Sequence, residues 1–246
     1  MFQKLFAAAG FGGAKVDAQL DKSQYRPGEL LTGKILIRGG SAEQDIAGLK
    51  VCLLTQVEIE SDSGSRSENR VLARWQQHEK SLLKPDQQLT LPFSMQLPLE
   101  TPITMLPGNP RVVPVWLGTE LEIDYGVDAN DRDYLRIEPV PAQANVLRAM
   151  ENLGFVIKHA DLEAGQARGN GFASSLGCYQ EIEYRASGTR RLRLNEVEIT
   201  FVLRADALGV LIELDRVGRS DTCVSRMYSL NATTSDIEND LYGLLC

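Results

Sequence analysis

The sequence predicts an all-β protein made of two β-sandwich domains, with a short helix near the domain boundary and a helix at the C-terminus. Residues 89–97 alternate between apolar positions and polar or proline positions, which is the period of a strand with one buried face. Similar short segments recur to the end of the chain, without the strand–long helix–strand succession of a parallel α/β fold. The length of 246 residues suffices for two ordinary domains.

The first domain is expected to span residues 1–136. A short strand at 16–20 is followed by the turn Pro27-Gly28, and a loop is expected at Gly39-Gly40. The small polar segment 61–68 predicts an exposed hairpin loop, and the four prolines between 102 and 114 predict a loop or a sheet edge. Further strands are expected at 31–38, 49–57, 71–82, 89–97 and 115–125.

The domain boundary is expected next to a helix. Residues 128–134 are rich in Asp and Asn and predict a turn, which two prolines at 139 and 141 follow. Val146, Leu147, Met150 and Leu153 then fall at helical spacing, and Gly154 can end that helix. The second domain is therefore expected to span residues 137–246.

The second domain returns to strands. Ile182 and Tyr184 share one face, with Glu181 and Glu183 on the other. Alternation continues over 197–204 and 210–215, where Glu198, Glu213 and Asp215 fall between apolar positions. At the end of the chain, Ser235 and Glu238 predict a capping box for a helix whose apolar face carries Ile237, Leu241 and Leu245.

Composition restricts the classes of function. The formal net charge is −7 and the pI about 5.0, so nucleic acid is not an expected partner. Cysteines at 52, 178, 223 and 246 lack the spacing of a zinc ribbon and are expected to be small hydrophobic residues in a reducing cytoplasm. No apolar run approaches the length that spans a bilayer, so we expect a cytoplasmic protein.

Residues 1–10 predict a short amphipathic helix. Phe2, Leu5, Phe6 and Ala9 share one face, and Gly10 can end the helix. The single lysine gives little attraction to anionic lipid, so packing on its own domain is favoured over contact with a membrane surface or a partner. The glycine cluster 10–13 lacks the residues of a phosphate-binding loop and predicts a hinge or turn.

One acidic run could bind a hard cation. It contains Asp124, Asp128, Asp131 and Asp133, but the calcium-loop pattern fails because Arg132 and Tyr134 stand where a ligand and a glycine belong. A solvated turn whose side chains bond their own backbone is the favoured interpretation. A cation site remains the alternative.

The aromatic and imidazole side chains leave two alternatives open. Trp75 and Trp116 could stack on a sugar if they are exposed, whereas burial is the ordinary role of tryptophan in a sandwich core. His78 and His159 are far apart in sequence, and no catalytic motif accompanies them. A pocket that brings either histidine to an acid and a nucleophile would indicate an enzyme.

Several segments together resemble a known family, the bacterial sporulation-control proteins of the arrestin-like superfamily. The likeness covers nearly the whole chain and is more specific in the first domain than after about residue 156. Residues 105–114 look longer than is usual in that family, and Leu176-Gly177-Cys178 replaces a more usual proline–phenylalanine pair. The segments that carry the resemblance are AKVD at 14–17, YRPGE at 25–29, LPFS at 91–94, TPIT at 101–104, VWLGT at 115–119, QEIEY at 180–184 and NEVE at 195–198.

The resemblance implies two arrestin-like β-sandwich domains joined end to end and a non-enzymatic cytoplasmic adaptor in developmental or stress regulation. Such proteins bind unidentified protein partners through sandwich edges, loops and the interdomain cleft, and an unpaired edge strand can take up an extended peptide. The resemblance carries over no catalytic, cofactor-binding or metal-binding residue, and it implies no cofactor. A small-ligand or carbohydrate-binding module is the alternative function.

Overall fold

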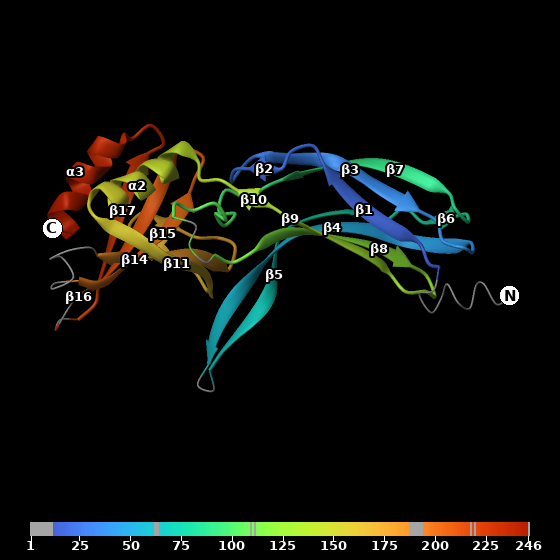
Figure 1. Cartoon of the computed structure of the whole chain (residues 1–246), viewed down its shortest axis with the longest axis horizontal. Coiled ribbons are helices and arrows are strands. Elements are labelled where there is room, and N and C mark those ends of the chain that lie inside the picture. The colour runs from blue at the N-terminus through green and yellow to red at the C-terminus, as the bar shows by residue number, and fades with distance from the viewer. Residues whose placement is uncertain are drawn as a thin grey trace.

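The structure is a computed structural model and describes residues 12–61, 64–108, 110, 112–186, 194–216, 218 and 220–245. The helix expected at residues 1–10 lies outside the described residues, as do the first two residues of the glycine cluster 10–13. The described molecule is elongated, with the first strands at one end and both helices at the other (Figure 1).

Two facing layers of strands form the first half, here called the N-terminal sandwich. One layer is the antiparallel sheet β1 (Lys15–Leu20), β3 (Leu30–Arg38) and β7 (Gln88–Gln96), in the order β1-β3-β7. The facing layer contains β4 (Gln44–Ser61), β8 (Val115–Ile123) and β9 (Ala129–Tyr134), and β4 also pairs with β5 (Gly64–Gln77) and β6 (Ser81–Leu83). The short strands β2 (Gln24–Tyr25) and β10 (Arg136–Ile137) pair in parallel.

Apolar side chains from alternate strand positions fill the space between these two layers. Leu31 and Ile35 on β3 are fully buried, as are Val51 and Leu53 on β4 and Leu117 on β8. Because every second residue of a strand points to the same face, this spacing buries one face of each sheet and leaves the other to solvent. The alternation in the sequence therefore specifies which face of each strand is buried.

The second half has one five-stranded antiparallel sheet, here called the second sheet. Its order is β17 (Thr222–Ser229), β16 (Ala207–Arg216), β15 (Leu194–Leu203), β14 (Cys178–Ala186) and β11 (Phe155–Ala164). Helices α2 (Pro141–Asn152) and α3 (Thr234–Leu245) form the layer on one face, where Met150, Ile237 and Leu241 join the core. The hairpin of β12 (Arg168–Gly169) and β13 (Phe172–Ala173) packs against β15 and β16 through Phe172.

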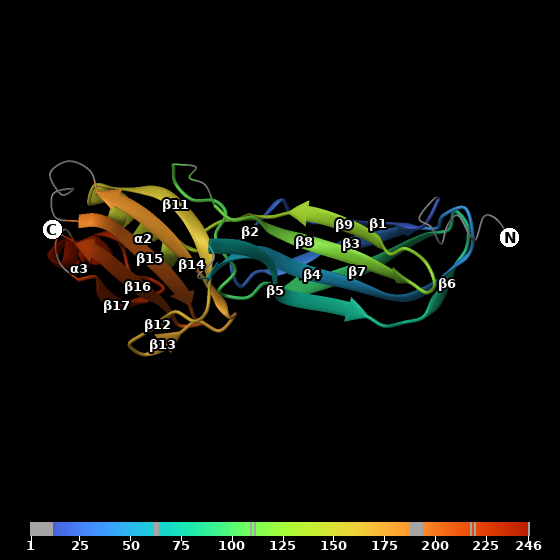
Figure 2. The ribbon, with the colours of Figure 1, turned by 90° about the horizontal axis from the view of Figure 1, so that it is seen from below.

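A single parallel residue pair joins the two halves into one ten-stranded sheet. Glu58 on β4 pairs with Glu163 on β11, while the β4–β5 hairpin continues past the sandwich and projects from the body of the molecule (Figure 1). The strands of the second sheet lie in front of the helices when the molecule is seen from below (Figure 2). The sheet face that carries no helix is covered in part by the β12–β13 hairpin, where Phe172 packs with Val202 and Leu211.

The all-β class and both expected helices are confirmed, and three local predictions are wrong. Residues 64–68 are strand and not loop, because β5 begins at Gly64 and Glu58 pairs with Ser67; residues 62 and 63 lie outside the described residues. Most of the run 128–134 is strand β9, since its polar residues suit an exposed edge. Small or acidic residues do not exclude a strand where pairing with a neighbour is already fixed by the fold.

The C-terminal helix has its cap two residues before the predicted one. Thr233, not Ser235, is the cap: its hydroxyl accepts the Asp236 amide at 3.2 Å, and the Asp236 carboxylate accepts the Thr233 amide at 3.2 Å. Glu238 instead accepts a hydrogen bond from Asn152 on α2. A capping box is therefore present with the expected three-residue spacing, but it is formed by Thr233 and Asp236 and not by Ser235 and Glu238.

Two further observations concern the class of protein. Cys52, Cys178 and Cys223 are free thiols. Among the described residues, no helix combines the length and apolar character needed to cross a membrane.

Candidate functional site

The open face of the second sheet concentrates acidic side chains. We call it the carboxylate face and define it by Asp161 and Glu163 on β11, Glu181 and Glu183 on β14, Glu196 and Glu198 on β15, and Glu213 on β16. These positions alternate with buried residues of the helix-covered core, such as Ile182 and Ile199. The strand period therefore directs all seven carboxylates away from α2 and α3.

Antiparallel register aligns these acids in a row across the strands. Glu183 lies opposite Glu198, and Glu198 lies opposite Glu213 on the next strand. One strand further along the sheet, Asp161 lies opposite Glu181. Like charges directly opposite one another destabilise a sheet, so this row costs folding free energy.

Burial and mutual repulsion raise the pKa values of the central acids. Burial, followed by the charges of Glu198 and Glu213, raises the pKa of Glu181 to about 8. Burial, followed by the charges of Glu213 and Glu183, raises the pKa of Glu198 to about 7. Positive charge brought to this face would relieve the repulsion.

Two basic side chains contact one end of the carboxylate face. Lys158 Nζ lies 2.8 Å from Glu183 and 3.0 Å from Glu196. His159 Nε2 lies 2.6 Å from Glu183 Oε1 and 3.3 Å from Asp161 Oδ2. Burial opposes ionisation of Glu183, but hydrogen bonds from Glu196 and Lys158 and the charge of His159 lower its pKa overall.

A cleft opens beside that end, between the β4–β5 hairpin and β11. Its volume is about 560 Å³, and its walls include Glu58 and Ser67 from the hairpin, Pro114 from the loop before β8, and His159 and Asp161 from β11. His159 is thus brought to two acids and into a cleft with a serine. Among the described residues, its contacts are with the carboxylates, and it makes no hydrogen bond to Ser67.

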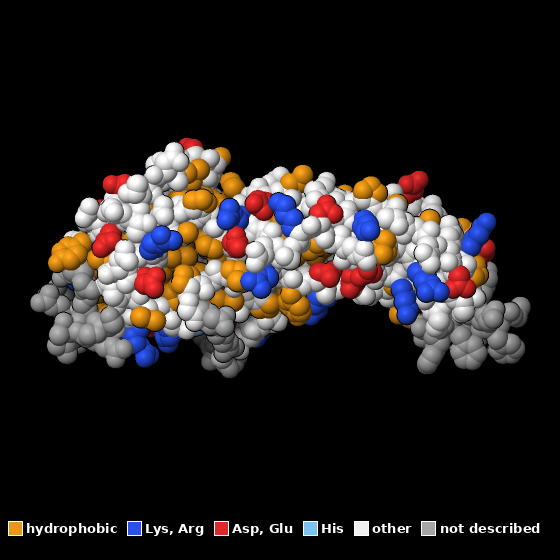
Figure 3. Space-filling model, turned by 45° about the horizontal axis from the view of Figure 1, so that its top comes forward, with side chains coloured by type: hydrophobic (Ala, Val, Ile, Leu, Met, Phe, Trp, Pro, Cys, Tyr) orange, Lys and Arg blue, Asp and Glu red, His pale blue; other side chains and the backbone are white. Residues whose placement is uncertain are grey.

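Another face of the molecule is different in character. Acidic and basic side chains are interspersed along the face shown in Figure 3. Mixed charge of this kind is the ordinary pattern of a protein surface, whereas the carboxylate face groups seven acids, three of which stand in one row across the strands. The carboxylate face therefore differs in charge pattern from the face shown in Figure 3.

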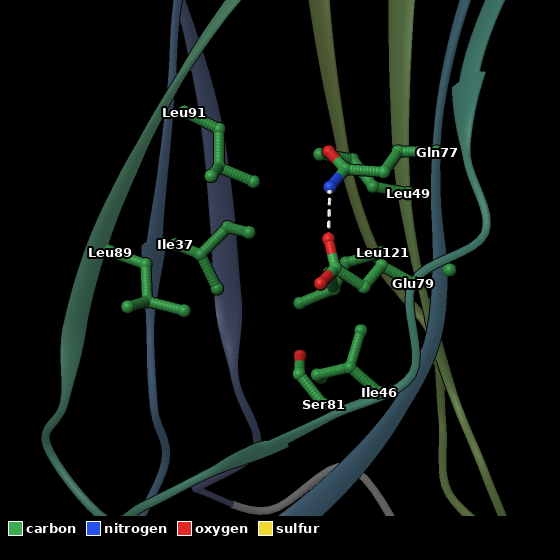
Figure 4. A pocket seen from close by; sticks show the side chains of 10 residues that line it. Ile37, Ile46, Leu49, Gln77, Glu79, Ser81, Leu89, Leu91 and Leu121 are labelled. Atoms are coloured by element: carbon green, nitrogen blue, oxygen red, sulfur yellow. Dashed lines mark hydrogen bonds between the residues drawn. The ribbon is translucent and has the colours of Figure 1, made fainter.

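A second cavity lies inside the N-terminal sandwich. It has a volume of about 230 Å³ and is walled mainly by aliphatic side chains, with Ile37, Leu89 and Leu91 on one layer facing Leu49 and Leu121 on the other (Figure 4). Gln77 donates a hydrogen bond of 2.9 Å to Glu79 at its edge. This cavity offers an apolar space with a polar rim.

The acidic run singled out in the sequence is split among separate roles. Asp124 pairs with Lys80, Asp128 accepts the Ile123 amide at 2.9 Å, and Asp131 accepts the Ala18 amide at 2.9 Å. Burial, followed by the charge of Asp131, raises the pKa of Asp133 to about 6. Within the described part of the chain, the donor atoms of these four acids do not converge on one ion position.

Neither tryptophan is an exposed platform. Trp116 is 3% exposed, and the Arg132 guanidinium lies 5.0 Å from its ring centroid. Trp75 is half-buried and packs beside Phe93 at a centroid distance of 6.2 Å. His78 is exposed and far from the cleft residues of β11.

The sequence interpretation missed strand β11, which supplies His159 and Asp161. A register irregularity between Ile157 and His159 interrupts its alternation. After that point, polar and apolar residues alternate as in a strand: His159, Asp161 and Glu163 with Ala160 and Leu162. The segment is too short to predict a strand by itself.

Comparisons with known proteins agree with this fold. A family model described as SpoOM protein (Spo0M) matches residues 2–218. The chain is 36% identical over 219 residues to the sporulation-control protein spo0M of Bacillus subtilis (strain 168), covering 89% of this chain and 81% of that protein. The crystal structure of Spo0M from Bacillus subtilis superimposes with a TM-score of 0.81 at 32% identity, over 95% of this chain and 98% of that one.

These observations define a predominantly β regulatory protein with two cores and an open acidic face. The chain belongs to the Spo0M family of sporulation-control proteins. The expected family is thus confirmed.

Proposed function

We propose that this protein is a non-enzymatic cytoplasmic adaptor that acts through protein–protein contacts, and that its carboxylate face binds a basic segment of a partner. The observation that carries the proposal is the aligned row Glu183, Glu198 and Glu213 on an open sheet face. Complementary charge guides partners to a surface and discriminates among them. Membership of a sporulation-control family supports a regulatory role in development or stress.

The domain division belongs to the same proposal. We place the boundary at residues 136 and 137, because α2 starts at Pro141 and the buried residues form two large clusters, one mainly from residues before this point and one mainly from residues after it. A few residues cross over: Ile103 and Leu106 belong to the second cluster, and Leu162 and Cys178 to the first. Each cluster is large enough to support its own unit of the fold. Limited proteolysis followed by mass spectrometry tests the boundary, with cleavage near residues 137–140 as the expected result.

The experiment for the binding surface compares two double variants. Glu198→Gln/Glu213→Gln removes two charges from the carboxylate face, and Glu120→Gln/Glu151→Gln removes two charges elsewhere. Tagged proteins are used to capture partners from the source cells at two salt concentrations, and each captured protein is then tested for direct binding. The adaptor proposal expects a salt-sensitive partner that the first variant loses and the control retains.

Other outcomes contradict parts of the proposal. A partner retained equally by both variants would remove the carboxylate face from the binding surface. The absence of any direct partner from growing, stressed and sporulation-inducing cultures would overturn the adaptor function. Turnover of a substrate by the purified protein, lost in a Glu183→Gln variant, would overturn the non-enzymatic role.

A small-ligand function is the second candidate, and the cavity inside the N-terminal sandwich favours it. Its aliphatic walls suit a small apolar molecule, whereas the covered tryptophans do not favour sugar stacking. Medium-chain fatty acids and alcohols should raise the melting temperature of the native protein but not of a cavity-filling Leu89→Phe variant. Equal shifts in both proteins would remove this cavity from consideration.

A further inference from the structure

An imidazole and two carboxylates converge at the end of the carboxylate face. The donor atoms of His159, Asp161 and Glu183 all lie within 4.8 Å of one another. His159 and Asp161 are two residues apart on β11 and therefore point to the same face, while Glu183 stands opposite His159 in register on β14. The register irregularity before His159 is of the kind that re-aims side chains in a strand.

A second group of donors shares Asp161. It adds Glu163 from the end of β11 and Glu58 from β4, and its oxygen atoms also lie within 4.8 Å of one another. Glu58 and Glu163 are the pair through which the N-terminal sandwich joins the second sheet. The two groups together place five metal-ligating side chains at the junction of the two halves.

The cleft beside β11 is an independent observation that gives a ligand access. His159, Asp161 and Glu58 line this space of about 560 Å³, so an ion and its remaining water ligands have both an entry path and room. His159, Asp161 and Glu183 are each half-buried. Partial burial limits competition by bulk water while leaving the donor atoms accessible.

We propose that His159, Asp161 and Glu183 bind one divalent transition-metal cation of the Zn²⁺ or Mn²⁺ class, with Glu58 and Glu163 positioned beside it. Imidazole nitrogen together with carboxylate oxygen is a donor set that suits these ions, and three protein ligands leave positions for water. The cation adds two positive charges at a site where His159 contacts the carboxylates of Asp161 and Glu183, and Lys158 contacts Glu183. Lys158 keeps Glu196 as a partner when Glu183 binds the metal.

The proposal does not rest on the adaptor function, because an ion can bind whether or not a protein partner does. If it is correct, the metal is bound by β11 and β14 of the second sheet, next to the pair of Glu58 and Glu163 through which β4 joins that sheet. Such an ion would act as a structural link or as a regulator of the junction.

The test uses the purified full chain after removal of metal with a chelator. Isothermal titration with ZnCl₂, MnCl₂ and CaCl₂ in separate runs should show one equivalent of Zn²⁺ or Mn²⁺ bound per chain, together with a rise in melting temperature. The variants His159→Ala and Asp161→Asn should weaken that binding by at least about tenfold. Glu183→Gln, which keeps the size of the side chain, provides a third variant in case either of these fails to fold.

His78→Ala is the matched control, because it removes the exposed histidine that lies away from the cleft. Its affinity should equal that of the native protein. A titration up to about 1 mM metal reaches the range of the weakest protein sites. Absence of stoichiometric binding in that titration would overturn the proposal. So would binding of Zn²⁺ or Mn²⁺ that His159→Ala leaves unchanged, or binding of Ca²⁺ alone.

Discussion

Glu198 on β15 stands directly opposite Glu213 on β16, and both carboxylates lie on the sheet face that the helices leave open. Cross-strand neighbours of like charge are unfavourable, and the raised pKa of Glu198 has burial and the charge of Glu213 as its first two causes. A protein that keeps such a pair sacrifices stability at this face. The proposed binding role gives that arrangement a reason.

Removing one member of this pair should stabilise the fold. We expect Glu198→Gln to raise the melting temperature at pH 7.5 by about 1–3 °C, since a like-charge pair costs about 0.2–1 kcal/mol in a sheet. Thermal unfolding followed by circular dichroism measures this. The control Glu151→Gln, on an exposed position of α2, should change the melting temperature by less than about 1 °C. A loss of stability in Glu198→Gln would show that the carboxylate accepts a stabilising contact.

Asp133 should lower the stability of the fold as the pH rises, whereas an ion-paired carboxylate raises it. Burial and the charge of Asp131 raise its pKa from 3.8 to about 6, so the folded state binds more protons than the unfolded state between these values. Its contribution to stability is therefore greatest below about pH 4 and is lost as the pH rises through 6. Asp133→Asn should raise the melting temperature at pH 7.5 and have much less effect at pH 4.

The comparison is made on the difference between variant and native protein at each pH, which cancels the titration of other groups. Asp86→Asn, on an exposed turn, serves as the control. A difference that is constant with pH would contradict a raised pKa at Asp133.

Gly33 should tolerate no side chain. A Cβ atom there would lie 2.4 Å from the carbonyl oxygen of Gln19 on the neighbouring strand, and 3.1 Å from the Cα of Leu20. The backbone must shift to accept it, so Gly33→Ala should cost about 1–3 kcal/mol in denaturant unfolding. Gly243→Ala is the counterpart, because a Cβ in α3 meets no atom within 4 Å and should stabilise the helix by about 0.5–1 kcal/mol. Equal effects of the two changes would refute this account of strand packing.

The start of α3 gives a direct test of which residue caps the helix. Thr233→Ala removes the hydroxyl that accepts the Asp236 amide and should cost about 0.5–2 kcal/mol. Ser235→Ala should be close to neutral, because position 235 lies inside the helix. Urea unfolding monitored by far-ultraviolet circular dichroism distinguishes them, and a larger loss in the serine variant would restore the cap expected from sequence.

The faces of single strands are predictable from sequence, but their alignment across a sheet is not. Alternation alone places four glutamates on the sheet face that the apolar residues do not use, as the structure does: Glu181, Glu183, Glu198 and Glu213. The row they form depends on the register of β14, β15 and β16, and a slip of one residue would turn every side chain to the other face. Local sequence carries little information about that register.

The cluster proposed to bind a metal is less predictable still. His159 and Asp161 lie on a strand whose alternation is interrupted, and Glu58 comes from a segment more than 100 residues away in the chain. Only the parallel pair of Glu58 with Glu163 brings these positions together. The acidic run that looked most like a cation site is instead divided between a strand and several separate hydrogen bonds.

The single residue pair between β4 and β11 couples the movement of the β4–β5 hairpin to that of the second sheet. The two halves share a sheet there through a single strand pair, while most of their buried side chains belong to different clusters. A rotation of the second sheet that preserves this pair must carry the outer part of the hairpin with it. A rotation that breaks the pair must also break the hydrogen bonds between Gln180 and the Ile103 backbone. It also disturbs both interiors, because Leu162 packs in the first cluster and Ile103 in the second.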